Sequence, residues 1–440
     1  MTTNDHTRRD SPGPAHAKLL PPAAPLPAAD PKAFAEFREG SERPASTTMV
    51  LVRLLGSLMR DKAIGRRIVP IIPDEARTFG MEGFFRQFGI YSPLGQLYEP
   101  VDRATLLPYV EAKDGQVLEE GITEAGAMAS FIAAGTAGST HGLELLPFFW
   151  FYSNFGLQRI GDLIWAAGEL RTRGFLVGGL SGRTQLQGEG LQHQDGNSQL
   201  LAYPVPNLRA YDPAFAYEIA EIVRAGLREM FEQQAPRFYY ITVGNESYAH
   251  PPMPAGVEEG IVRGAYLFRK ADAAGAKARA RLLGSGAILR EAVAAADLLR
   301  PYGVAADVFS VTSYKELYRD ATAAAREALW QPGTPAREPY VAQCLGQGEG
   351  PVVAASDYVR ALPDSIAPFV PGPFVSLGTD GFGRSESRAA LRDFFEVDAR
   401  HIAYAALSAL VRQGALPPSL AERAARELDL DLARPAAVES

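Results

Sequence analysis

An acidic residue stands at the entrance of a strongly apolar segment, LEEGITEAGAMASFIAAGTAGS, at residues 118–139. The second half of this segment is almost entirely Ala, Gly, Met, Phe and Ile, which is typical of a helix packed on every side. Glu124 directly precedes that half. As a first-turn acid it would gain about 0.3–1 kcal/mol from the helix dipole and would face solvent. Held in a dry place instead, it would have a raised pKa and could share a proton with a ring nitrogen.

A second group of reactive residues lies in the glycine-rich segment GRTQLQGEGLQHQDGNS, residues 182–198. It follows the apolar stretch GFLVGGL, so we expect a loop at the end of a strand. His193 and Glu189 are four residues apart in this loop. A single histidine in a loop is commonly a surface residue, but a histidine beside an acid can also exchange protons with a ligand.

A third segment, residues 71–109, combines acids with a stretch rich in Gly, Pro and Tyr. Its acids include Asp74, Glu75 and Asp102. The length and composition predict a long functional loop or a contact with another subunit.

The elements that position these residues alternate between strand-like and helix-like patterns. Short apolar runs such as LLPFFWF and RFYYITVG alternate with longer amphipathic stretches from about residue 44 to 248, and a smaller unit of the same kind covers 276–440. This alternation predicts an α/β fold with parallel sheets covered on both faces. Residues 1–43 are rich in Pro and Ala and predict a flexible tail with a short helix near 32–38, and the Pro-rich start of 249–275 predicts a linker.

Composition excludes several classes of protein. The 440 residues carry a net charge of −7 without a basic stripe, which argues against a nucleic-acid partner. No run of 18 apolar residues predicts a membrane span, and the N-terminus lacks a secretory apolar region. The single cysteine, Cys344, fits a cytoplasmic protein. The spacing of His and Cys predicts no metal site of the zinc type.

Several longer segments resemble the C-terminal half of the decarboxylating component of the bacterial, homodimeric-type pyruvate dehydrogenase complex. In chain order they are PDEARTFGMEGFFRQFGIYSP, EGITEAGA, FGLQRIGDLIWAAG, GGLSGRTQLQGEGLQHQDG, VTSYKEL, LGTDGFGRS and FEVDARHIAYAAL. The resemblance implies the transketolase-superfamily fold. Residues 44–248 would form the pyrimidine-binding thiamin diphosphate domain, and residues 276–440 the transketolase C-terminal domain.

The resemblance also assigns roles to single residues. Glu124 corresponds to the glutamate that contacts the aminopyrimidine ring of thiamin diphosphate and promotes its imino tautomer. Phe155 resembles the aromatic residue stacked on the pyrimidine, and Tyr152 is its polar neighbour. The remaining candidates are Glu189 and His193, which resemble loop residues facing the thiazolium and the substrate, Glu75, a second active-site acid, and Asp102, in a loop that orders over the reaction intermediate.

The sequence departs from the family pattern in two respects. The histidine is usually continued as His-Glu-Asp-Gly-His, whereas Gln194 and Asn197 stand here. The Gly-Asp-Gly motif that holds magnesium and the diphosphate is absent from these 440 residues. We therefore expect a second chain to carry the diphosphate-binding domain and most of the Mg²⁺ site, giving an α2β2 enzyme.

Three functions remain open at this point. The first is the β-like subunit of a split pyruvate dehydrogenase that passes an acyl group to a lipoyl acyltransferase or an acyl carrier protein. The second is a transketolase-like transfer of a two-carbon ketol unit from a ketose phosphate to a carrier protein. The third is a non-catalytic scaffold for the partner subunit.

Overall fold

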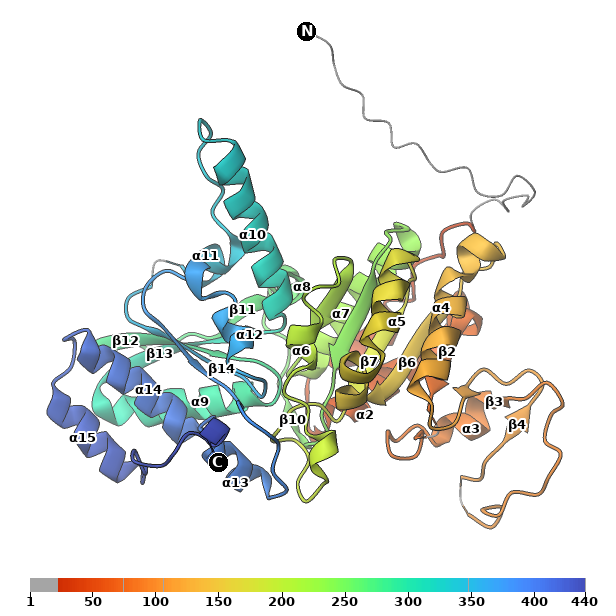
Figure 1. The fold of residues 1–440 in the computed structure, drawn as a ribbon, viewed down its shortest axis with the longest axis horizontal. Coiled ribbons are helices and arrows are strands. Elements are labelled where there is room, and N and C mark those ends of the chain that lie inside the picture. The colour runs from red at the N-terminus through yellow and green to blue at the C-terminus, as the bar shows by residue number, and fades with distance from the viewer. Residues whose placement is uncertain (1–22, 74, 106, 347, 440) are drawn as a thin grey trace, which may run out of the picture.

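Two sheets form the centre of the molecule. The computed structural model describes residues 23–73, 75–105, 107–346 and 348–439, which contain a six-stranded and a five-stranded sheet (Figure 1). Two further pairs of short strands lie outside these sheets. Asp74, Leu106 and residues 1–22 lie outside the described residues. The predicted α/β fold class is confirmed.

The first sheet is entirely parallel and follows the strand order β5-β2-β6-β7-β9-β8. Its strands are β2 (Ile68–Ile72), β5 (Leu118–Glu119), β6 (Leu146–Tyr152), β7 (Phe175–Gly179), β8 (Leu208–Tyr211) and β9 (Phe238–Thr242). The strands β6, β7 and β9 are buried almost throughout. Their continuous apolar sequences reflect helices on both faces, since a sheet with one solvated face would show alternation.

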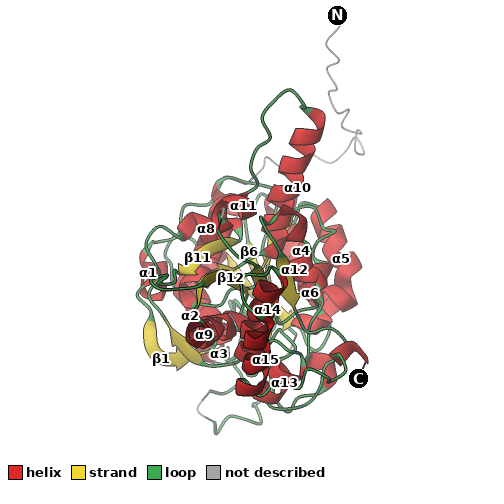
Figure 2. Ribbon diagram, turned by 90° about the vertical axis from the view of Figure 1, so that its left-hand side faces the viewer, coloured by secondary structure: helices red, strands yellow, loops and turns green. Residues whose placement is uncertain are grey.

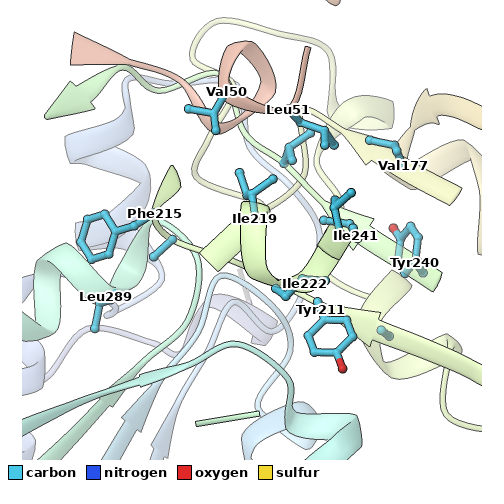
Figure 3. Close-up of a cluster of buried hydrophobic side chains, with 14 of the residues drawn as sticks. Val50, Leu51, Val177, Tyr211, Phe215, Ile219, Ile222, Tyr240, Ile241 and Leu289 are labelled. Carbon is cyan, nitrogen blue, oxygen red and sulfur yellow. The ribbon is translucent and has the colours of Figure 1, made fainter. Parts of the chain in front are cut away.

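Four longer helices cover this sheet: α2 (Thr47–Met59), α4 (Glu124–Thr140), α5 (Leu157–Glu169) and α7 (Ala216–Leu227). Helices α4 and α5 lie side by side (Figure 1). Helix α2 packs against α7, where Val50 and Leu51 meet Ile219 of α7 and Ile241 of β9 in one buried cluster (Figure 3). The same cluster includes Leu289 of the second sheet's helix α9 (Ile288–Leu299), so apolar packing is continuous between the two units.

The second sheet has the order β11-β13-β12-β14-β15 and is parallel except for β11. Its strands are β11 (Ala265–Arg269), β12 (Ala278–Gly284), β13 (Val304–Val311), β14 (Val352–Ala355) and β15 (Phe374–Leu377). Its other helices are α8 (Glu258–Arg263), α10 (Tyr314–Trp330), α11 (Tyr340–Leu345), α12 (Ala361–Asp364), α13 (Arg388–Phe394), α14 (Ala399–Arg412) and α15 (Pro418–Glu427). Helix α10 projects away from the body of the molecule (Figures 1 and 2).

The described part of the expected tail is packed rather than extended. Helix α1 (Lys32–Arg38) was expected near these residues, and it buries Phe34 and Phe37 against the protein. Strand β1 (Ser41–Ala45) pairs with β10 (Tyr248–His250). The two phenylalanines, three residues apart, give α1 an apolar face, which the high content of Pro and Ala obscured.

A domain boundary within 249–275 remains our prediction, although β11 in this range pairs with β13 of the second sheet. The remaining short elements are α3 (Gly83–Phe88), β3 (Ile90–Tyr91), β4 (Glu111–Ala112) and α6 (Ser198–Leu201). Among the described residues, no helix combines the length and the apolar character needed to span a membrane.

Candidate functional site

Helix α4 begins where the sequence placed it, directly after the short strand β5. The hydroxyl of Thr123 accepts a hydrogen bond from the backbone N–H of Gly126 at 3.2 Å, which satisfies one of the free donors of the first turn. Glu124 is the first helical residue and is only 7% exposed. The carboxylate is therefore a buried group and not a solvated helix start.

An arginine contacts this carboxylate. Arg159 lies in the first turn of α5 and donates from Nη1 to both oxygens of Glu124, at 3.1 and 3.0 Å. Its guanidinium carbon also lies 4.3 Å from the centre of the Phe155 ring. Glu124 and Phe155 therefore form two sides of a cradle for a flat group that carries N–H donors.

Aromatic rings from a strand end and from the glycine-rich loop gather beside this cradle. The His193 ring stacks on Tyr152 with the ring centres 4.7 Å apart and meets Phe155 edge to face at 5.5 Å. The ring centre of Phe79 lies 5.4 Å from that of Tyr152. The Nδ1 atom of His193 has no hydrogen-bond partner among the described residues and lies 3.5 Å from a carboxylate oxygen of Glu189. The fold thus brings Tyr152, Phe155, Glu189 and His193 together.

The loop that carries Glu189 and His193 is held by the second unit of the chain. The backbone N–H of Arg384 donates to the Gln194 side chain at 2.8 Å, and Gly188 N–H donates to the carbonyl of Glu386 at 3.2 Å. The Arg388 guanidinium donates to the carbonyl of Gln185 at 2.7 Å. Gln194 is buried among these contacts, so its amide braces the loop.

Glu75 and Asp102, the two remaining candidate residues, differ in how they relate to the aromatic cluster. Partial burial raises the pKa of Tyr152, and the charges of Glu75 and Glu189 raise it further, so Glu75 lies near the aromatic rings. Glu75 also accepts a hydrogen bond from Thr78 at 2.7 Å. Asp102 instead forms an ion pair with Arg77. Asp102 also accepts from the backbone N–H of Tyr109 at 3.4 Å, and within the described part of the chain it makes no hydrogen bond or ion pair with Tyr152, Phe155 or His193.

Sequence reasoning missed Arg159. The usable signal was its position at the start of the helix predicted shortly after Phe155. An arginine in such a first turn looks unfavourable for the helix dipole. The buried carboxylate of Glu124 belongs to α4, and its ion pair with Arg159 of α5 offsets that cost. Such a contact between two helices could not be predicted from local sequence.

Within the described residues, one group of potential metal ligands comes together outside this site: Asp393, Asp398 and His401. Arg400 contacts both aspartates, and the backbone and ring nitrogens of His401 donate to or contact Asp398. These basic partners already compensate the carboxylates, so the group is an ion-pair network at the start of α14.

Family comparisons agree with this architecture. Residues 24–251 match the family described as "Pyruvate dehydrogenase E1 component middle domain", and residues 264–398 match "Transketolase-like TK C-terminal domain". Transketolase structures from Campylobacter jejuni (TM-score 0.62, 16% identity, covering 85% of this chain and 49% of that one) and Leishmania mexicana (TM-score 0.64, 16% identity, covering 87% and 48%) share the fold. The fold is therefore transketolase-like.

Relatives with similar sequences define the family of this chain more closely than the fold does. The Pseudomonas aeruginosa protein named "Pyruvate dehydrogenase E1 component" is 55% identical over 392 residues, covering 89% of this chain and 44% of that protein. The Escherichia coli K12 protein of the same name is 48% identical over 401 residues, covering 90% and 45%. The chain belongs to the pyruvate dehydrogenase E1 component family. It spans less than half the length of these curated relatives.

Proposed function

We propose that this chain is the β-like subunit of a split, thiamin diphosphate-dependent 2-oxoacid dehydrogenase with pyruvate as the substrate. The observation that carries the proposal is the cradle of Glu124 and Phe155, flanked by Tyr152 and His193. When bound, thiamin diphosphate would supply the carbon nucleophile and electron sink that decarboxylation needs. The chain's own residues would bind and orient it and would move protons.

The cradle fits an aminopyrimidine ring. The Arg159 guanidinium, a flat group with several N–H donors, donates to Glu124 and lies over the Phe155 ring, so these two side chains can contact such a group together. Glu124 would hold the ring through a proton at a ring nitrogen, and the low exposure of its carboxylate would strengthen that bond.

His193 and Glu189 would act on the substrate side. Within the described ranges of the chain, the Nδ1 atom of His193 lacks a hydrogen-bond partner, and the neighbouring Glu189 side chain is half exposed at 50%. The pair can therefore exchange a proton with a ligand that enters from solvent. Glu75, which raises the pKa of Tyr152, would add a second acid at the rim, and Asp102 would belong to a loop outside it.

The diphosphate half of the site would come from a partner chain. The 440 residues lack the Gly-Asp-Gly motif of the family, so we propose that the partner binds most of the Mg²⁺ and the diphosphate in an α2β2 assembly. A solved structure titled "Split gene transketolase, inactive beta4 tetramer" supports such an arrangement, because the alignment covers 87% of this chain and 98% of that one at a TM-score of 0.51 and 16% identity. The acyl group would pass to a lipoyl acyltransferase or an acyl carrier protein.

The test uses the chain assembled with the partner that copurifies with it. Pyruvate should release carbon dioxide in the presence of thiamin diphosphate and Mg²⁺. Glu124→Gln should lower this rate by about 10²–10⁴-fold, since it removes general acid–base help and little volume. Glu169→Gln, at the exposed end of α5, should leave the rate unchanged.

Two other outcomes would reject the proposal. Formation of a triose phosphate from xylulose 5-phosphate, without carbon dioxide release from pyruvate, would indicate ketol transfer. Full activity of the Glu124→Gln assembly would indicate a scaffold. Gln194, which departs from the family pattern, is buried in contact with the second unit. Its position therefore gives no reason to expect a substrate other than pyruvate.

A further inference from the structure

A small polar cavity lies between the two sheets, outside the site described above. It is about 20 Å³ in volume and is lined by residues that follow the carboxyl ends of strands in both sheets, including Asp212 after β8, Gly286 after β12, and Asp357 and Tyr358 after β14. A cavity of this volume holds one water-sized body, because about 10–15 Å³ of such space is enough for one.

The Asp212 carboxylate is incompletely paired in this cavity. One of its oxygens accepts a hydrogen bond from the Thr242 hydroxyl at 2.8 Å, and Oδ2 is buried without a hydrogen-bond partner in the part of the chain that the structure describes. Burial raises the pKa of Asp212 to about 7, and the hydroxyls of Thr242 and Ser285 oppose that rise. A methyl group added to Gly286 would lie 2.6 Å from Oδ2, so the glycine leaves room for this oxygen.

A second buried polar atom without a partner lies on the same cavity. Tyr358 is only 1% exposed, and among the described residues its hydroxyl has no hydrogen-bond partner of good geometry. Burial raises the pKa of Tyr358 well above its ordinary value, and the nearby Ser181 hydroxyl, which also lines the cavity, opposes that rise. A buried hydroxyl of this kind costs about 1–3 kcal/mol when it stays unpaired. Because Asp212 and Tyr358 line one cavity, a single bound body can contact both residues.

The lining has the chemistry of a hard-cation site. Besides Asp212 and Tyr358, the lining includes Thr47, Ser181 and Gln185, whose side chains carry oxygens, and no Lys, Arg or His is among the described residues that line it. The oxygens of Asp357 are already taken, since they accept from Thr184 N–H at 3.0 Å, the Thr184 hydroxyl at 3.0 Å and the Gln185 amide at 3.3 Å. One available carboxylate with neutral oxygens matches a singly charged metal ion, whereas divalent sites commonly use several carboxylates.

We propose that this cavity binds one monovalent metal cation, Na⁺ or K⁺, between Asp212 and the Tyr358 hydroxyl. The bound ion would join the two sheets, because Asp212 follows the first and Tyr358 the second. Entry would take place past Asp212 and Gly244, which are partly exposed, whereas the other lining residues are buried. The proposal needs neither a cofactor nor a partner chain, so it stands or fails independently of the proposed function.

Thermal unfolding of the full chain in KCl, NaCl and choline chloride at equal ionic strength tests the site. A ligand that binds only the folded state raises its melting temperature, and we expect an increase of about 2 °C or more in KCl or NaCl. The salt that gives the larger increase identifies the preferred ion. Asp212→Asn should abolish the difference, and Tyr358→Phe should reduce it. Asp297→Asn, which removes an exposed carboxylate of α9, should retain it.

Diffraction from crystals grown in rubidium chloride locates the ion directly. An anomalous peak in contact with Asp212 would support the proposal. Equal melting temperatures in the three salts, or a site filled by a water molecule without anomalous signal, would overturn it. Both measurements use the unsubstituted chain, so they remain informative even if a variant fails to fold.

Discussion

Arg159 shows how a single residue can prepare a site for a ligand. It contacts Glu124 through two hydrogen bonds and covers Phe155, while its own side chain is 52% exposed. The Glu124 side chain is only 9% exposed, so removal of Arg159 would leave a buried carboxylate without this partner, at a cost of about 1–3 kcal/mol. The ion pair therefore holds both the position and the charge of the Glu124 carboxylate.

The Arg159→Met variant tests whether Arg159 supports activity beyond its effect on stability. We expect the free energy of unfolding to fall by about 1–3 kcal/mol, and the activity of the assembled enzyme to fall about 10-fold or more, because a misplaced catalytic group loses its geometry. Urea unfolding and steady-state rates measure the two effects. Arg300→Met, at an exposed arginine, is the control. A loss of stability that accounts for all of the lost activity would contradict the assignment.

At the scale of elements, strand ends and helix starts decide where the candidate residues lie. The apolar runs of β6, β7 and β9 and the start of α4 at Glu124 follow from sequence, since pattern and capping residues are local. The bracing of the His193 loop by Arg384 and Arg388 could not be predicted in this way. Those contacts join residues about 190–200 positions apart and depend on how the two sheets pack.

Helix α14 provides an element-scale prediction about pH. Its N-cap, Asp398, accepts from His401 N–H at 3.0 Å, and contacts with His401 and Arg400 lower the pKa of the carboxyl to about 2 despite its burial. The folded pKa is below the unfolded value of about 3.9. The resulting stabilisation is thus complete above pH 4 and is lost as the pH falls towards 2.

Asp398→Asn keeps a cap acceptor and removes the charge. We expect it to lower the free energy of unfolding by about 1–2 kcal/mol at pH 7, with the difference from the unsubstituted chain shrinking between pH 4 and pH 2. Chemical denaturation at a series of pH values measures this difference. A difference that does not change across that range would show that the charge of Asp398 is not responsible.

At the scale of the whole molecule, polar contacts join the two sheets as well as apolar ones. Lys315, at the start of α10, is buried and donates to the carbonyls of Ala202, Val205 and Leu208 at 2.7, 2.7 and 2.6 Å. All three ammonium protons are used, and the three acceptors belong to the segment that leads into and begins β8.

Removing the three hydrogen bonds of Lys315 should weaken the packing between the two units. Lys315→Met would leave three carbonyl oxygens without their donor, and we expect a loss of about 3 kcal/mol or more in the free energy of unfolding. Urea unfolding measures it, and Lys270→Met at an exposed lysine is the matched control. Equal midpoints for the two variants would mean that the segment before β8 is held by other contacts.

The central claim is that Glu124 bonds to the ring of a bound cofactor, and a structure of the assembled protein with thiamin diphosphate tests it most directly. We predict that a Glu124 oxygen lies about 2.6–3.2 Å from a nitrogen of the aminopyrimidine ring, with that ring against Phe155. A complex in which the coenzyme binds while Glu124 faces open solvent, or in which the ring lies elsewhere, would contradict the account.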